Sequence, residues 1–306
     1  TIQIDDGWQM GIGDWEPNAK FPNGMAALAD AIVATGREAG LWLAPLIAAA
    51  DSRLAQTRPE LLLRNAEGNP VVSGINWGGP YYSLDPTADA TADFLSDLII
   101  TVRSWGFSYL KLDFLYAAAF PGVHARPMPR ELAYRHAAEV MRRAAGSDCY
   151  LLACGAPVIA STGIFDGVRI GPDAAAFWEE TELAAMGDAS GRGTRNAIAT
   201  SSQRLWLRGA FDTDPDVVYL DRSEVNLNSR TLESLWDLAR ITGFVGTSER
   251  LADLSPEERE QLRSLLTDDP AVERGPNMGW VINGKGVDFG WVAGSDAAAT
   301  SGAAPS

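Results

Sequence analysis

The sequence is poor in the residues that metal sites and disulfide frameworks require. Its 306 residues include two cysteines and two histidines. Cys149 and Cys154 are too few for a disulfide framework and do not have the spacing of metal ligands. His124 and His136 are too few for a histidine-based metal site. We therefore expect a protein that holds no metal ion.

Long apolar runs and an excess of positive charge are also lacking. The longest apolar candidate, residues 95–102, lies within an amphipathic segment and is much shorter than a membrane span. The net charge of −15 argues against nucleic acid as a partner, because nucleic-acid binding depends on cationic contacts. We expect neither a membrane nor a nucleic-acid partner, and interpret most of the acidity as solubility.

The two ends of the sequence carry signals of their own. No signal peptide is visible, so a cytoplasmic location is the default expectation. The sequence begins at Thr1, without an initiator methionine and directly in a strand-like run, which suggests that upstream sequence has been lost or cut away. Residues 297–306 are rich in small residues and are expected to form a tail or linker. No pattern indicates an oligomeric state.

Short apolar segments alternate with helical segments along most of the chain. With 46% hydrophobic and 21% charged residues, the composition is that of an ordinary globular protein, and the length suits an α/β barrel. Strands are predicted at residues 1–4, 40–45, 81–84, 108–113, 150–154, near 170, and at 217–220 and 244–246. Helices are predicted at residues 25–39, 58–65, 87–105, 129–145, 194–208, 231–242 and 256–266.

This alternation predicts an α/β fold, a parallel (β/α)8 TIM barrel over residues 1–268. Residues 279–282 and 287–292 also resemble β-strands. We therefore expect residues 269–306 to hold the start of a C-terminal β region, a short β-like segment with a flexible tail.

Aspartates gather at the ends of the predicted strands. In the fourth of these strands Leu110 and Leu112 face one side, while Lys111 and Asp113 face the other. Asp173 closes an apolar run that a glycine and a proline end. Further aspartates lie at or just after strand ends: Asp5, Asp6 and Asp85. Cleavage of a glycosidic bond needs two carboxylates delivered to one rim, so Asp113 and Asp173 are the predicted catalytic pair.

Several motifs, met in order, resemble those of a known enzyme family. They are Ile4-Asp5-Asp6-Gly7-Trp8-Gln9, Gly13-Asp14-Trp15, Phe21-Pro22, Gly40-Leu41-Trp42-Leu43-Ala44-Pro45, Lys111-Leu112-Asp113 and Asp166-Gly167-Val168-Arg169-Ile170-Gly171-Pro172-Asp173. Together they resemble the catalytic barrel of the family 36 α-galactosidases of glycoside hydrolase clan D, over residues 1–266. One such motif alone is a weak signal, whereas several in order at predicted strand ends are a strong one.

The resemblance implies a retaining glycoside hydrolase that cleaves terminal α-linked galactose from oligosaccharides such as melibiose or raffinose-type sugars. It implies that Asp113 is the nucleophile and Asp173 the acid/base. The implied galactose-binding residues are Asp5, Asp6, Trp42, Lys111, Cys154 and Arg169. This mechanism requires no metal and no organic cofactor, and the expected partner is an α-galactoside oligosaccharide as substrate.

The residue types suit this chemistry. The transition state resembles an oxocarbenium ion, so Asp113 must be ionised, and Lys111 on the same strand face favours that state. Asp173 must instead carry a proton to help the leaving group depart. Burial would raise the pKa of Asp173 and favour this protonated form, whereas Arg169 would lower the pKa. The sequence does not decide which effect is larger.

The substrate-binding candidates also have structural interpretations. Paired carboxylates at Asp5 and Asp6 suit a grip on vicinal sugar hydroxyls, and Trp42 either presents an apolar face to the sugar or fills the core. Lys111 and Arg169 either contact sugar or neutralise buried acids. Cys154 is interpreted first as a small buried hydrophobe. Other tryptophans could line the pocket but are left out of the site, because several of the ten must be structural: Trp8, Trp15 and Trp77.

Departures from the family pattern keep other functions open. The family's Cys-x-x-Gly-Gly-x-Arg pattern after strand five is replaced by Cys154-Gly155-Ala156-Pro157, and family members generally carry β-domains before and after the barrel. One alternative is a galactosyl transferase like the raffinose or stachyose synthases. Others are a carbohydrate-binding or inactive barrel that lacks its N-terminal domain, and a Schiff-base lyase that uses Lys111.

Overall fold

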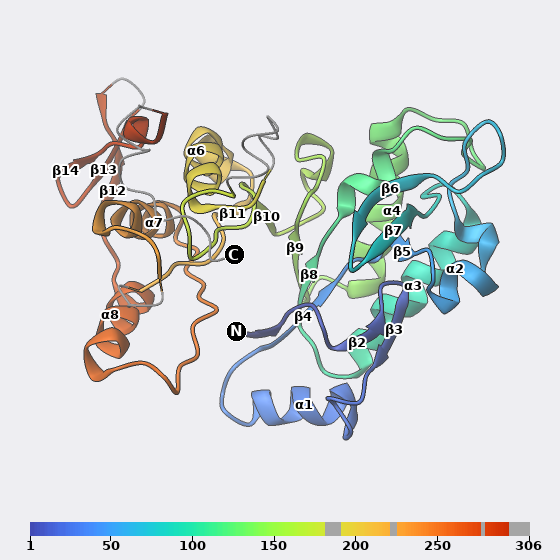
Figure 1. The fold of residues 1–306 in the computed structure, drawn as a ribbon, viewed down its shortest axis with the longest axis horizontal. Coiled ribbons are helices and arrows are strands. Elements are labelled where there is room, and N and C mark those ends of the chain that lie inside the picture. The colour runs from blue at the N-terminus through green and yellow to red at the C-terminus, as the bar shows by residue number, and fades with distance from the viewer. Residues whose placement is uncertain (181–190, 221–224, 277–278, 294–306) are drawn as a thin grey trace. The chain divides into compact units, whose positions relative to one another are not determined.

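The structure, a computed structural model of the chain, describes residues 1–180, 191–220, 225–276 and 279–293 (Figure 1). The chain forms two compact units, Thr1–Val168 and Arg169–Ser306. No helix among the described residues is both long and apolar enough to cross a lipid bilayer.

A parallel sheet is the centre of the first unit. Its strands lie in the order β1 (Ile2–Ile4), β4 (Ala39–Leu43), β8 (Tyr109–Leu112), β9 (Tyr150–Ala153) and β10 (Gly167–Arg169), and each is parallel to its neighbour. Spatial order therefore follows chain order, as repeated strand–helix–strand connections produce. Every residue of β4 is buried, which is typical of a parallel strand covered on both faces.

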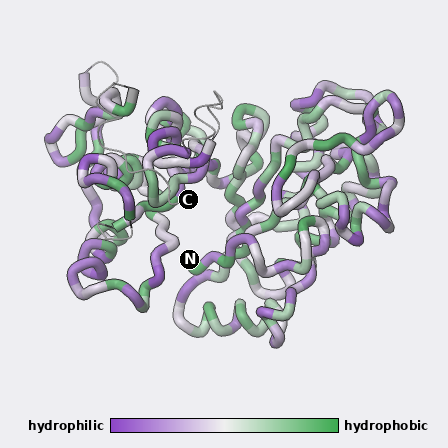
Figure 2. The backbone as a smooth tube through the Cα atoms, in the orientation of Figure 1, coloured by the Kyte–Doolittle hydropathy of each residue, from purple (hydrophilic) through white to green (hydrophobic). Residues whose placement is uncertain are grey.

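Three helices of the first unit connect these strands: α1 (Gly24–Val33), α3 (Asp89–Ser104) and α4 (Arg130–Ala145). α1 is apolar along most of its length, as Figure 2 shows. It is shorter than predicted, because a turn at Gly36, with φ of +76°, follows it. α3 buries Leu95, Ile99 and Val102, spaced to form one stripe, and packs against α4.

The segment predicted as the third barrel strand is elsewhere. Residues 81–84 largely belong to β7 (Gly79–Ser83), which pairs antiparallel with β5 (Ile47–Ala49) and β6 (Val72–Asn76) in a separate sheet. The prediction was wrong because β6 and β7 form a hairpin through Trp77 and Gly78, whose φ angles are 50° and 82°. Such a two-residue turn folds the second strand back on the first, and β4 then pairs directly with β8.

Shorter elements complete the first unit. β2 and β3 form an antiparallel pair, and the others are single turns or short helices. They are β2 (Gln9–Gly11), β3 (Asp14–Pro17), α2 (Arg53–Thr57), η1 (Pro59–Leu61), η2 (Leu115–Ala119) and η3 (Ile159–Ser161).

The second unit contains helices and a small antiparallel sheet. The helices among its described residues are α6 (Thr194–Arg204), η4 (Leu205–Gly209), α7 (Ser229–Thr242), α8 (Pro256–Thr267) and η6 (Gly290–Ala293). α8, mostly hydrophilic in Figure 2, starts with a capping box between Ser255 and Glu258. The sheet order is β12 (Val272–Arg274), β13 (Trp280–Ile282) and β14 (Lys285–Val287).

Two segments predicted as strands of this unit form a single β-bridge in place of regular strands. Residues 217–220 and 244–246 form an isolated parallel bridge between Val217 and Gly246. A strand that the sequence did not reveal, β11 (Asp212–Asp214), lies at the end of β10, where the Ile170 amide donates to the Asp214 carbonyl at 2.9 Å. The predicted strand at 279–282 is β13, whereas 287–292 mostly forms the turn η6. The boundary at residue 268 stays a prediction.

A buried carboxylate connects β7, α3 and the loop before α4. Asp85 Oδ1 accepts hydrogen bonds from the Thr87 amide at 3.0 Å and hydroxyl at 2.8 Å, and from His124 Nδ1 at 3.0 Å. Asp85 Oδ2 accepts one from the Ala125 amide at 2.7 Å. Burial raises the pKa of Asp85, but these hydrogen bonds together outweigh it and hold the pKa below its usual range.

Replacing this carboxylate should therefore weaken the fold in a pH-dependent way. Because the pKa of Asp85 is lower in the folded state, its contribution is complete above the unfolded pKa of about 3.9 and is lost as the pH falls through the folded pKa. We expect Asp85→Asn to lower the free energy of unfolding by about 1–3 kcal/mol at neutral pH. Urea unfolding should show this difference shrinking below about pH 4.

A matched control is Asp51→Asn, since Asp51 is an exposed aspartate in a turn of the same unit. Its effect should stay within about 0.5 kcal/mol at every pH. A difference between wild type and Asp85→Asn that does not change with pH would contradict the assigned role of the carboxylate.

Candidate active site

The carboxyl ends of β1, β4 and β8 bring four predicted site residues to one edge of the sheet. Trp42 of β4 is in register with Lys111 of β8, and Asp5 and Asp113 directly follow β1 and β8. Carboxyl ends of parallel strands are where α/β enzymes place their chemistry. Strand pairing thus gathers these four residues at one edge of the sheet.

Asp5 and Lys111 form an ion pair at this edge. Lys111 Nζ lies 2.8 Å from Asp5 Oδ2, and Gln3 Nε2 donates to the same oxygen at 2.6 Å. Asp5 Oδ1 accepts the Asp6 amide at 2.9 Å, so the turn after β1 is fixed as well. The lysine side chain is largely buried and the aspartate half-exposed, so the pair holds a charged, solvent-reachable carboxylate in place.

The proposed nucleophile is held on both of its oxygens. Trp42 Nε1 donates to Asp113 Oδ2 at 3.1 Å, and the Phe114 amide donates to Asp113 Oδ1 at 2.7 Å. The Asp113 amide donates to the Leu43 carbonyl at 2.7 Å, continuing the pairing of β8 with β4. Two donors stabilise an ionised carboxylate and fix its direction, which a nucleophile requires. Trp42 is therefore more than core filler, because its indole contacts Asp113.

Cys154 follows β9 and is 2% exposed. Its amide donates to the Leu112 carbonyl at 2.8 Å, and its carbonyl accepts the Leu115 amide at 3.3 Å. Its backbone thus supports the turn behind Asp113. Both cysteines lie in the described part of the chain and form no disulfide. The sugar contact predicted for the Cys154 thiol stays a prediction.

In the second unit, Arg169 binds three aspartates. Its Nη1 lies 3.0 Å from Asp173 Oδ1, its Nε donates to Asp214 Oδ2 at 2.9 Å, and its Nη2 lies 2.7 Å from Asp216 Oδ1. The side chains of Arg169 and Asp214 are 8% and 4% exposed, whereas that of Asp173 is 66% exposed. The guanidinium is therefore anchored from inside the unit, and Asp173 is the one carboxylate of the cluster that water readily reaches.

Asp216 completes this cluster in a strained conformation. Its φ is 80°, its amide donates to Asp214 Oδ1 at 2.8 Å, and its Oδ2 accepts the Ala174 amide at 2.7 Å. Burial raises the pKa of Asp216; Arg169 lowers it, and the negative charges of Asp214 and Asp173 raise it, for a net rise.

The same environment affects a neighbouring phenol. Burial and the charges of Asp216, Glu249 and Asp173 raise the pKa of Tyr219 to about 12. Tyr219 thus stays protonated at neutral pH, and its hydroxyl donates to the Ala174 carbonyl at 3.4 Å. The backbone next to Asp173 is in this way tied to the segment after β11.

Sequence reasoning missed Asp214 and Asp216. The segment Phe211-Asp212-Thr213-Asp214-Pro215-Asp216 lies between a predicted helix and a predicted strand, so its acids did not fall at a strand end. An aspartate-rich strand has low β propensity, and β11 was missed for that reason. The signal that could have revealed them is three aspartates, each two residues from the next, directly before the short apolar run at 217–220.

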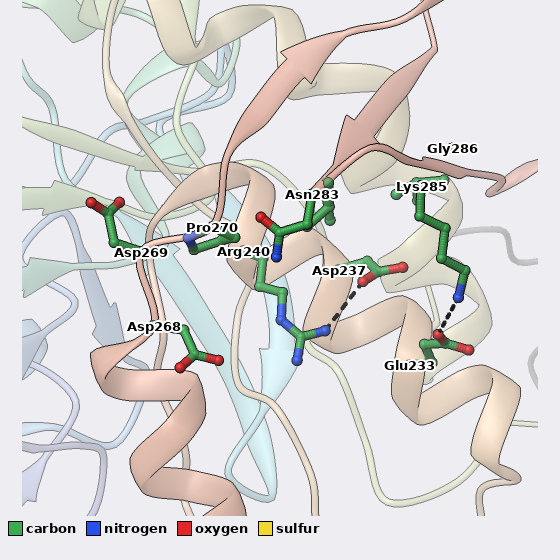
Figure 3. A pocket seen from close by; sticks show the side chains of 11 residues that line it. Glu233, Asp237, Arg240, Asp268, Asp269, Pro270, Asn283, Lys285 and Gly286 are labelled. Atoms are coloured by element: carbon green, nitrogen blue, oxygen red, sulfur yellow. Dashed lines mark hydrogen bonds and ion pairs between the residues drawn. The ribbon is translucent and has the colours of Figure 1, made fainter.

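The described residues also leave a hollow that contains none of the predicted site residues. It has a volume of about 640 Å³ and lies between α7, the end of α8 and the β13–β14 turn (Figure 3). Its charged groups pair with one another, Lys285 with Glu233 at 3.0 Å and Arg240 with Asp237 at 3.3 Å. Strand-end carboxylates, not this hollow, mark the candidate site. No cluster of potential metal ligands occurs among the described residues.

The two predicted catalytic acids belong to different units. Asp113 follows β8 in Thr1–Val168, and Asp173 lies in Arg169–Ser306. The structure brings Asp113 together with Trp42, and Asp5 with Lys111, in the first unit; it brings Asp173 together with Arg169 in the second. Convergence of Asp113 and Asp173 stays a prediction.

The chain is similar to known proteins over most of its length. Residues 2–140 match the Melibiase family. A relative from Flavonifractor plautii, the A type blood α-D-galactosamine galactosaminidase, is 34% identical over 141 residues, 42% of this chain and 13% of that protein. The structure of the α-galactosidase from Thermus thermophilus in complex with p-nitrophenyl α-D-galactopyranoside is 44% identical, with a TM-score of 0.89, over 95% of this chain and 60% of that one. These matches confirm the predicted resemblance to α-galactosidases, which the family model places over residues 2–140.

More distant structures share the fold. The family 36 α-galactosidase from Geobacillus stearothermophilus is 15% identical, with a TM-score of 0.62, over 92% of this chain and 40% of that chain. The chain thus spans 60% or less of the length of each of these relatives.

Arg169 should be critical for the stability of the second unit. Removing it leaves Asp214 and Asp216 buried without a cation, so we expect Arg169→Ala to lower the free energy of unfolding by about 3–5 kcal/mol. Denaturant unfolding followed by circular dichroism measures the loss.

Arg250→Ala provides the comparison, because Arg250 pairs with Asp253 at the surface and its side chain is 84% exposed. That change should cost less than about 1 kcal/mol. Equal losses in the two variants would show that the Arg169 cluster does not stabilise the fold.

Proposed function

Because residues 2–140 carry a melibiase-family domain, we propose that this chain is the catalytic part of a retaining α-galactosidase. The observation that carries the proposal is the position of Asp113 within the matched segment, at the carboxyl end of β8. There the carboxylate is oriented by Trp42 and lies on the same strand edge as the Asp5–Lys111 pair. A directed carboxylate beside groups that can grip hydroxyls suits attack on a sugar.

The proposal includes closure of a (β/α)8 barrel. The main sheet contains six strands, β1, β4, β8, β9, β10 and β11. Later in the chain, two more strand-like segments are joined by the bridge between Val217 and Gly246. Together these are eight strand segments, which is the number that the barrel needs. In a closed barrel, the ends of β8 and β10 open on the same mouth, which would bring Asp113 and Asp173 to opposite sides of one glycosidic bond.

The chemistry follows from two carboxyl groups in different protonation states. An Asp113 oxygen bonds to the anomeric carbon while the bond to the leaving oxygen breaks, and Asp173 gives its proton to that oxygen. Asp173 then takes a proton from water, whose oxygen displaces Asp113 from the sugar. Two inversions leave the configuration unchanged. In this mechanism Arg169 orients Asp173. The galactosyl group is bound by Asp5, Asp6, Trp42, Lys111, Cys154 and Arg169.

The proposed substrates are terminal α-galactosides. The Thermus thermophilus enzyme has been solved with p-nitrophenyl α-D-galactopyranoside and, in a structure 46% identical to this chain, with stachyose. The Flavonifractor plautii relative is named for an α-D-galactosamine substrate. A panel of nitrophenyl glycosides separates galactose from N-acetylgalactosamine specificity, and the ratio of galactose release to transfer separates a hydrolase from a galactosyl transferase.

Removal of the proposed nucleophile tests the mechanism. Asp113→Gly should lower turnover of an aryl α-galactoside by a factor on the order of 10³ or more, because the covalent step is lost. Azide fits the space left by the carboxylate and should restore release of the aryl group, with β-galactosyl azide as the product.

Asp51→Gly, at an exposed turn aspartate, is the control and should keep wild-type turnover. A fully active Asp113→Gly variant, or an azide product with the α configuration, would remove Asp113 from its assigned role.

A further inference from the structure

A tryptophan at the tip of the β6–β7 hairpin holds one of the predicted sugar-binding carboxylates. Trp77 Nε1 donates to Asp6 Oδ2 at 2.8 Å, and Gln9 Nε2 donates to Asp6 Oδ1 at 2.7 Å. Both oxygens of Asp6 are thus directed by side-chain donors. A sugar hydroxyl bound by this carboxylate would meet an acceptor whose orientation Trp77 sets.

The backbone at Trp77 is held in a conformation that bulky residues rarely adopt. Its φ is 50°, and its amide donates to Asn76 Oδ1 at 2.9 Å. At this turn position glycine is favoured because it has no β-carbon, and asparagine or aspartate because their short polar side chains hydrogen-bond the local backbone. A tryptophan is therefore unusual at this turn position. Strained backbone positions of this kind are concentrated at functional sites.

The indole also packs next to the proposed nucleophile. Its ring centroid lies 5.2 Å from that of Phe114 and 5.8 Å from that of Tyr81. Phe114, which directly follows Asp113, is itself left-handed with φ of 55°. Two strained aromatic residues therefore contact each other, and they reach Asp6 on one side and Asp113 on the other.

Part of the indole remains open to solvent. Trp77 is 39% exposed even though one edge is hydrogen-bonded and its ring packs on two others. Sugars carry an apolar C–H face that packs on aromatic rings, and an exposed indole beside a hydroxyl-binding carboxylate suits that contact.

We propose that Trp77 is a substrate-positioning residue of the first unit, with two roles toward the terminal sugar. Its N–H orients Asp6, and the part of its side chain that stays open to solvent packs against the sugar that Asp5 and Asp6 bind. The inference rests on the proposed function, and it adds a residue that neither the motifs nor strand-end position indicated.

Two substitutions separate these roles. Trp77→Phe keeps an aromatic ring but removes the N–H donor, and Trp77→Asn keeps a residue suited to the left-handed turn but removes the ring. We expect Trp77→Phe to lower kcat/KM about tenfold, since a hydrogen bond to a charged group is lost. Trp77→Asn should lower it about fivefold more, since the aromatic contact is lost as well.

The loss should appear mainly in KM, because binding of the sugar is weakened in the ground state and the transition state alike. It should be equal for p-nitrophenyl α-galactoside and raffinose, which share the terminal sugar and differ in the leaving group. Galactose affinity, measured by calorimetry, should fall by the same factors. Melting temperatures measured alongside show whether the variants are folded.

Trp206→Phe and Trp206→Asn are matched controls, because Trp206 is an exposed tryptophan of the second unit at 59% exposure. Both should keep wild-type kcat/KM. Wild-type galactose affinity and KM in folded Trp77→Asn would overturn the proposal, and so would a loss confined to raffinose, which would place the ring against the leaving group.

Failure of this inference is distinct from failure of the proposed function. If wild-type protein cleaves α-galactosides and Asp113→Gly does not, while Trp77→Phe and Trp77→Asn match wild type, the mechanism stands and the role of Trp77 is wrong. If wild-type protein neither cleaves α-galactosides nor binds galactose, the proposed function fails, and this inference with it.

Discussion

The parallel register between β4 and β8 is the constraint on which the first unit's chemistry depends. It places Trp42 beside Lys111, and the pleat then puts Asp113 on the same side as Lys111. A slip of one residue would turn these polar side chains into the core and expose Leu110 and Leu112, which are fully buried. Burial of leucines on one face of the strand thus fixes the direction of the carboxylate on the other.

In the second unit the corresponding constraint is electrostatic. The positive charge of a guanidinium removed from water must be balanced by nearby negative charge. Arg169 carries one positive charge and pairs with three carboxylates, so negative charge is in excess. The surplus negative charge is accommodated by a raised pKa at Asp216 and by the exposure of Asp173. A cluster of this kind stabilises the fold and at the same time keeps one carboxyl group, that of Asp173, pointing toward solvent.

Sequence patterns were sufficient where periodicity and length were strong. The predicted helices at 87–105, 129–145 and 256–266 correspond to α3, α4 and α8 within two residues at each end. Predictions for short segments were less accurate. The β6–β7 hairpin was missed because its turn places a tryptophan where asparagine is usual, and β11 because its residues are mostly acidic. Both failures lie beside predicted site residues, where local rules are commonly broken for function.

By itself, the sequence determined most of the alternation of strands and helices, the resemblance to a known enzyme family, and the residues that strand ends deliver: Asp5, Trp42, Lys111 and Asp113. Those features are local or follow from the two-residue period of a strand, so they can be recognised from the order of residues in the sequence. Only the tertiary structure decided that Lys111 pairs with Asp5, that Trp77 holds Asp6, and that Asp214 and Asp216 anchor Arg169. Such pairings join residues up to 106 positions apart, and they depend on strand register and on burial of charge, which no local pattern encodes.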